Sequence, residues 1–279
     1  MLLGGLIHAS VDDPDAWVDA VEAADYAATF CPVGPDATPE EIAAYRHRAD
    51  AAGIVIAEVP GFGPNPLARD ESEREQAMDE LAARLRLADA IGARCVVNIA
   101  GSRHPERWDG PHPENYTERT FDLIVESVQG IIDAVEPTET YFTLETMPWM
   151  YPDSVASYRR LVETIDRERF GVHFDPVNLV NSPRRYYATG ELIDEFVTEL
   201  GPHIRSVHLK DIALREDLTT HLDEVRPGTG NLDYPALLQS LESLDREVPM
   251  LLEHLDSAAE YEEAAAYVRS VADDVGVRI

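Results

Sequence analysis

The chain has 279 residues, of which 44% are hydrophobic, and its 53 acidic against 23 basic residues give a formal charge of −30. This length suits one α/β barrel, which commonly runs to about 250 residues as a single domain. So acidic a chain is not expected to bind nucleic acid, whose phosphate backbone attracts basic patches. The acidic, lysine-poor composition is also similar to that of proteins from salt-loving organisms, where high ionic strength screens the self-repulsion.

Two further features of the composition concern location. The sequence has no apolar run of the length, about 18 residues, that a membrane span needs, and its start lacks the basic residues of a secretory signal. Cys31 and Cys95 lie in apolar surroundings and are predicted to be free thiols. The sequence therefore predicts a cytoplasmic protein.

Short apolar runs alternate along the chain with stretches of helical period. The predicted strands cover residues 2–9, 26–30, 53–59, 93–100, 140–146, 171–175, 204–210 and 248–254. A helix is predicted after each strand; Pro14 and Pro39 mark two helix starts, and the clearest helical period runs from about 117 to 135. A doubly wound sheet has the same alternation, but eight repeats favour a (β/α)8 TIM barrel formed by residues 1–279 as a single domain.

Each of the last four predicted strands ends in a candidate metal ligand. These are Glu145 in TLETM, Asp175 in HFDP, His208 in VHLKD and Glu253 in LLEHL. Active sites of such barrels lie at the C-terminal ends of the strands, so the four side chains are expected to meet. Three carboxylates and one imidazole suit one divalent ion, with Mn²⁺ as the first choice and Mg²⁺, Co²⁺ or Zn²⁺ open. Any one of them alone could equally be a helix cap or an ion-pair partner.

The four motifs, in this order and spacing, resemble the xylose-isomerase-like TIM-barrel superfamily of sugar-phosphate isomerases and epimerases, with its AP endonuclease (family 2) relatives. The resemblance covers essentially the whole chain and is strongest from Thr140 to Leu255, where VHLKD and RPGTGNLDY are similar to the family's seventh strand end and the loop beyond it. It implies one divalent ion at the four ligands and a polyhydroxylated or keto substrate that chelates the ion.

The resemblance also implies that Glu145 and Glu253 face each other across the substrate as catalytic residues. One would remove a proton from a carbon next to a carbonyl, giving a metal-stabilised enediolate, and the other or the same one would return it. Return of the proton to the opposite face of the same carbon gives epimerisation, and return to the neighbouring carbon gives aldose–ketose isomerisation. A lyase acting on keto-sugars or C-glycosides would begin with the same step, and both glutamates could instead be ligands only.

Two basic residues are candidate contacts for a sugar or sugar-phosphate substrate. Lys210 is the only lysine of the chain and lies two residues after His208, so it is expected to face the barrel mouth, one step nearer to solvent. There it could hold a substrate oxygen, or form an ion pair with Asp211 or another carboxylate. Arg226 precedes a glycine-containing loop and could bind a substrate oxygen or carboxylate, or form an ion pair with Glu224.

Three more residues are candidates for substrate binding. His173 lies two residues before Asp175 and should share its inward face, where it could orient a ligand, contact substrate or be an ordinary core histidine. Asn178 stands where many members of the family have a histidine; its amide can bind a substrate hydroxyl but cannot carry a proton. Trp149 follows Glu145 and could stack on a sugar or pack the loop.

An AP endonuclease is the alternative from another functional class. Its three-metal site would need histidines at the ends of the third and fourth strands and in the sixth-strand motif, where this chain reads EVPG, NIAG and DPVN. We therefore expect no nuclease. A non-catalytic binding protein on the same barrel and a homo-oligomer remain open. Glu58 and Asn98, near these strand ends, are further candidates for lining the pocket.

Overall fold

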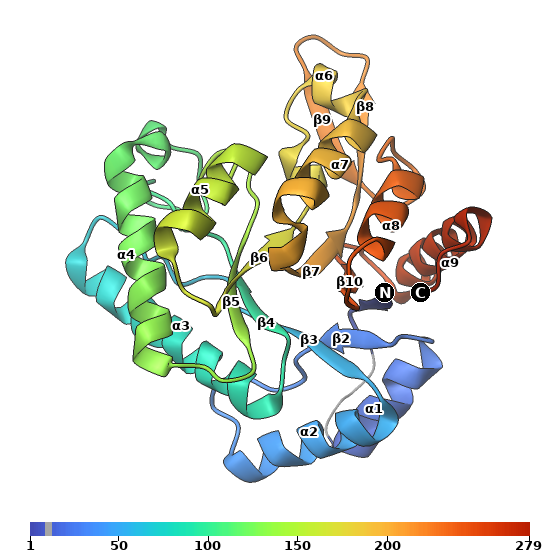
Figure 1. The fold of residues 1–279 in the computed structure, drawn as a ribbon, viewed down its shortest axis with the longest axis horizontal. Coiled ribbons are helices and arrows are strands. Elements are labelled where there is room, and N and C mark those ends of the chain that lie inside the picture. Colours follow the sequence, from blue (N-terminus) through green and yellow to red (C-terminus); the bar gives the residue numbers. More distant parts are fainter. Residues whose placement is uncertain (9–12) are drawn as a thin grey trace.

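The computed structural model describes residues 1–8 and 13–279 and is drawn in Figure 1. Within these residues, eight parallel strands form a closed barrel in the order β1-β10-β7-β6-β5-β4-β3-β2. The strands are β1 (Leu2–Gly5), β2 (Ala28–Phe30), β3 (Val55–Pro60), β4 (Cys95–Asn98), β5 (Tyr141–Glu145), β6 (Phe170–Phe174), β7 (Ile204–Leu209) and β10 (Pro249–Leu252). All eight predicted strands are present with shifted ends; residue 9 of the first lies outside the described residues. The (β/α)8 prediction is confirmed.

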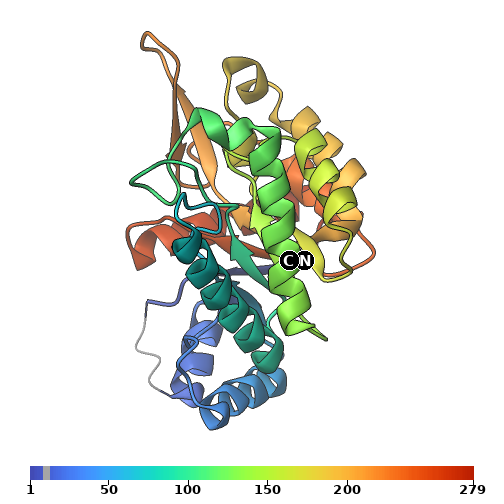
Figure 2. The same cartoon turned by 90° about the vertical axis from the view of Figure 1, so that its left-hand side faces the viewer.

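Helices surround the barrel on its outer side (Figures 1 and 2). They are α1 (Pro14–Ala23), α2 (Pro39–Ala52), α3 (Glu71–Ile91), α4 (Glu118–Val135), α5 (Val155–Ile165), α6 (Pro183–Tyr186), α7 (Thr189–Leu200), α8 (Tyr234–Glu242) and α9 (Ala258–Val275). The local sequence sets their ends: α2 begins with a capping box between Thr38 and Glu41 and ends at Gly53, whose φ of 69° suits glycine. In α4 the apolar stripe that contains Phe121 and Ile131 is buried against the barrel.

An antiparallel hairpin, β8 (Asp211–Arg215) paired with β9 (His221–Val225), follows β7 and was not predicted from the sequence. It projects away from the barrel in Figure 2. Asp211 anchors its base, because its buried carboxylate accepts hydrogen bonds from the backbone N–H groups of Ile212, Gly228, Gly230 and Leu232. This carboxylate therefore joins the hairpin to the loop that leads into α8.

Three other structural features bear on the sequence predictions. Cys31 and Cys95 are both free thiols, as expected. In the described part of the chain, no helix combines the length and the apolar character needed to cross a membrane. The two termini lie side by side (Figure 1), and the Met1 amino group donates to the Arg278 carbonyl at 3.3 Å.

Candidate metal centre

The barrel topology gathers the four candidate ligands at one place. Glu145 ends β5, Asp175 follows β6, His208 lies in β7 and Glu253 follows β10, and these four strands are consecutive neighbours in the barrel. One nitrogen or oxygen atom from each side chain lies within 4.8 Å of the others. The side chains are buried at the C-terminal ends of the strands, where barrel enzymes place their chemistry.

The geometry around His208 fits a bound cation. His208 Nδ1 lies 2.9 Å from Glu253 Oε1 and 3.5 Å from Glu145 Oε1. Yet neither His208 Nδ1 nor Glu253 Oε1 has a hydrogen-bond partner among the described residues, so the two atoms lie close without the angles of a hydrogen bond. Glu253 Oε1 is in contact with the ammonium group of Lys210, but His208 Nδ1 has no such partner in the described part of the chain, and a buried polar atom left in this way costs free energy. A metal ion at His208 Nδ1 would satisfy this nitrogen, and three carboxylates with one imidazole are suitable donors for Mn²⁺ or Mg²⁺.

Lys210 lies inside this cluster. Its Nζ is 2.7 Å from Asp175 Oδ2, contacts Glu253 Oε1 directly, and is 3.6 Å from Glu145 Oε1 and 3.8 Å from Glu224 Oε2. Only 2% of Lys210 is exposed, so its ammonium group is enclosed, and the contacts agree with the alternative that it forms an ion pair with a carboxylate other than Asp211. The ammonium group pairs with candidate metal ligands, while the neighbouring Asp211 binds backbone N–H groups.

Burial and close charges shift the pKa values of the cluster in different directions. Burial raises the pKa of Glu145 to about 7, although Lys210 opposes this. Burial would also raise the pKa of Glu253, but His208 and Lys210 hold it well below its usual range. Burial would lower the pKa of His208 and of Lys210; the surrounding carboxylates instead raise both well above their ordinary values. The imidazolium and ammonium groups therefore balance the carboxylates while no divalent ion is bound.

These shifts predict that ion binding releases protons. An ion needs the carboxylate of Glu145 and an unprotonated Nδ1 on His208, whereas in the ion-free protein the raised pKa values keep His208 protonated at neutral pH and Glu145 largely protonated below about pH 7. The apparent affinity for Mn²⁺ should therefore rise with pH, by about tenfold per pH unit for each proton released. Calorimetric titrations in two buffers of different ionisation enthalpy would count the protons, and Glu145→Gln should remove one of them. An affinity that stays constant between about pH 5 and pH 7 would contradict this account.

Besides Lys210, two more of the predicted substrate-binding residues contact the candidate ligands. Asn178 Nδ2 lies 3.0 Å from Glu145 Oε1 and 3.0 Å from Asp175 Oδ2 and donates to both. His173 is buried in the barrel interior, with Nδ1 2.7 Å from Ser206 Oγ and its ring centroid 4.0 Å from that of His208. Asn178 therefore fixes the positions of two carboxylates, and His173 packs against the imidazole.

The other two candidates are engaged elsewhere. Arg226 Nη2 lies 3.1 Å from Glu263 Oε2 on α9, so its ion-pair partner is not the expected Glu224. Glu224 instead lies 2.9 Å from His254 Nδ1. Trp149 donates its indole N–H to the Asp109 carbonyl at 2.8 Å, which joins the loop after β5 to the loop after β4. The sequence could not show these partners, because they come from distant elements.

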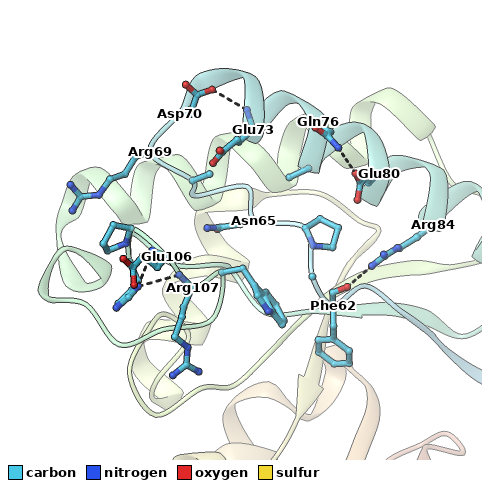
Figure 3. A pocket seen from close by; sticks show the side chains of 17 residues that line it. Phe62, Asn65, Arg69, Asp70, Glu73, Gln76, Glu80, Arg84, Glu106 and Arg107 are labelled. Carbon is cyan, nitrogen blue, oxygen red and sulfur yellow. Dashed lines mark hydrogen bonds between the residues drawn. The ribbon is translucent and has the colours of Figure 1, made fainter.

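A separate hollow of about 680 Å³ lies beside the barrel, between α3 and the loops after β3 and β4 (Figure 3). Among the described residues, its lining does not include the four candidate ligands. Three arginines line it, and each side chain already has a partner: Arg69 pairs with Glu114, Arg84 donates to the Phe62 carbonyl and Arg107 pairs with Asp109. We assign this hollow no role, because its cations are already partnered.

Comparisons with known proteins agree with the fold. A family model described as "Xylose isomerase-like TIM barrel" matches residues 18–271. D-psicose 3-epimerase with D-tagatose from Clostridium cellulolyticum is 14% identical, with a TM-score of 0.72 and 100% of each chain covered. Endonuclease IV from Thermus thermophilus is 16% identical, with a TM-score of 0.74 and coverage of 98% of this chain and 100% of that one.

A xylose isomerase-like TIM barrel protein from Mycobacterium smegmatis in complex with magnesium is also similar. It is 16% identical, with a TM-score of 0.68, and the match covers 95% of this chain and 90% of that one. A comparison with curated protein sequences gives no match. At such identities the likeness to solved structures establishes the fold alone.

Proposed function

The chain belongs to the xylose isomerase-like TIM barrel family, and from this premise we propose that it is a divalent-metal-dependent sugar or sugar-phosphate isomerase or epimerase. The observation that carries the proposal is the joint position of Glu145 and Glu253. Both lie beside His208 Nδ1, at 3.5 and 2.9 Å, so two carboxylates that could move a proton share one buried centre. A purely structural ion pair would not need three acidic strand ends gathered around one imidazole and one ammonium group.

Glu145, Asp175, His208 and Glu253 would hold the ion, with Mn²⁺ as our first choice and Mg²⁺, Co²⁺ or Zn²⁺ as alternatives. When bound, the ion would polarise the carbonyl of a chelating substrate and so lower the barrier to removal of a proton from the adjacent carbon. The oxygen-rich donor set favours this role, because such substrates offer hydroxyl and carbonyl oxygens as further ligands.

The residues of the chain would supply the proton transfers. Glu253, whose Oε1 lies 2.9 Å from His208 Nδ1 in the buried centre, would accept a proton from carbon. Glu145 would return the proton from another side, or Glu253 itself would do so. Lys210 could neutralise the enediolate from within the cluster, and Asn178 holds Glu145 and Asp175 in place. Trp149 and Arg226 keep a substrate-binding role only if their loops move toward the centre.

Deuterium exchange tests the proposal directly. The protein, loaded with Mn²⁺, would be incubated in D₂O with a panel of ketoses, keto-sugars and their phosphates, and carbon-bound deuterium would be followed by NMR. We expect ion-dependent exchange with at least one member of the panel. Product spectra would distinguish epimerisation, isomerisation and β-elimination. Absence of exchange with every substrate, together with cleavage of abasic DNA, would replace the proposal with the nuclease alternative.

A further inference from the structure

We propose that Glu58 is a positioning residue that holds the imidazole of His208 with Nδ1 directed at the ion. The inference rests on the metal centre of the proposed function and adds a residue outside the four ligands. Glu58 lies on β3, and β7, which carries His208, is four strands away in the eight-stranded barrel. The two side chains therefore approach each other from opposite walls of the barrel interior.

The contact between them is short and enclosed. Glu58 Oε2 lies 3.1 Å from His208 Nε2, with 1% of Glu58 and none of His208 exposed. Its other oxygen, Oε1, is 3.5 Å from His173 Nδ1 and has no hydrogen-bond partner among the described residues. A carboxylate taken out of water in this way is costly unless a donor satisfies it. The N–H on Nε2 of His208 is the donor that the geometry offers.

This contact determines which nitrogen of His208 is free. A neutral imidazole carries its proton on one nitrogen and a lone pair on the other. With the proton on Nε2 and shared with Glu58, the lone pair lies on Nδ1, which is the atom nearest to Glu253 and Glu145. Histidines that bind metals commonly donate their second N–H to a carboxylate, which fixes the ring and makes it a better ligand.

The local fold explains how Glu58 comes to point inward. The register between β2 and β3 shifts at this point: Thr29 pairs with Ile56, but Phe30 pairs with Glu58, which leaves Ala57 as an extra residue. Such an irregularity re-aims the side chains that follow it. His173 then closes the site from the side, because its ring packs edge-on against His208 and its Nδ1 contacts Ser206.

A second ion between Glu58, His173 and His208 is the competing account, since these three side chains also lie close enough to share one. It would require His208 to bind ions through both nitrogens and thus to lose both ring protons. All three side chains are fully enclosed, so this ion would have no room for substrate or water. The hydrogen-bonded arrangement needs neither condition, and ion stoichiometry distinguishes the two.

The experiment compares Mn²⁺ binding by calorimetry in the wild type, Glu58→Leu, Glu58→Gln and the control Thr29→Val. Thr29 is also buried in the barrel wall, but its hydroxyl donates to the Gly5 carbonyl, away from the centre. We expect Glu58→Leu to weaken Mn²⁺ binding about 10- to 100-fold. Glu58→Gln should recover part of the loss, because its amide oxygen can still accept from Nε2, and Thr29→Val should bind as the wild type does. The wild type should bind one ion per chain.

An unchanged affinity for Mn²⁺ in a folded Glu58→Leu variant would overturn the inference. So would a stoichiometry of two ions per chain in the wild type and one in the variant. If Glu58→Leu does not fold, ¹⁵N NMR of the Mg²⁺-loaded wild type decides: the inference requires the proton of His208 on Nε2, and a proton on Nδ1 refutes it. Deuterium exchange is measured in parallel. If ion binding depends on Glu58 but no deuterium exchange is seen, only the proposed activity is rejected. If the wild type binds no ion, both the activity and the role of Glu58 are rejected.

Discussion

Glu253→Gln is expected to lower the ion-dependent rate of deuterium exchange by about 10²–10⁴-fold, the usual contribution of a positioned general base. Glutamine has nearly the same shape as glutamate but cannot accept a proton from carbon. Glu253 suits this role by its position, because its carboxylate is buried in the centre and its Oε1 lies 2.9 Å from His208 Nδ1.

Because Glu253 is also a candidate ligand, Asp175→Asn serves as the matched control. Asp175 likewise contributes a carboxylate to the cluster and contacts Lys210, but it has no assigned role in proton transfer. We expect both variants to bind Mn²⁺ more weakly. At saturating Mn²⁺, exchange should largely recover in Asp175→Asn and remain low in Glu253→Gln. Full recovery in Glu253→Gln would show that this glutamate is a ligand only.

The sequence predicts the barrel well because its signals are local and repeated. A buried parallel strand reads as an apolar run, and a covering helix reads as an apolar stripe such as that of α4, whose bounds agree with the prediction to within a residue or so. The grouping of Glu145, Asp175, His208 and Glu253 also follows, because in a barrel the ends of neighbouring strands must lie together. These inferences need only the order of the elements.

The features that the sequence did not predict depend on contacts across the barrel or between loops. Glu58 could be named as a candidate for the pocket, but its contact with His208 depends on the register shift in β3, which leaves no pattern in the sequence. The partner of Arg226 is on α9, far along the chain. Strand period places Lys210 on the inward face but does not show that its long side chain folds back among the carboxylates.

That position of Lys210 leads to the second large effect. Without a divalent ion, Lys210→Met is expected to destabilise the protein by about 3–5 kcal/mol, because it leaves buried carboxylates without their cation. Asp175 Oδ2, 2.7 Å from Nζ, and Glu253 Oε1, in direct contact with it, would be most affected. Asp175 and Glu253 are also two of the four candidate ligands. The ammonium group and the ion therefore compete, and the variant should bind Mn²⁺ more tightly than the wild type.

Urea unfolding in EDTA and in saturating Mn²⁺ measures both consequences. The difference in free energy of unfolding between wild type and Lys210→Met should be large in EDTA and much smaller with Mn²⁺, because the tighter-bound ion stabilises the variant more. Arg215→Met is the control: Arg215 pairs at 2.7 Å with Asp223 on the exposed hairpin, and such pairs contribute less than about 1 kcal/mol. Its effect should be small and independent of Mn²⁺. If Lys210→Met lost the same stability in EDTA and in Mn²⁺, the ammonium and the ion would not share one place, and Lys210 would be a structural cation apart from the metal centre.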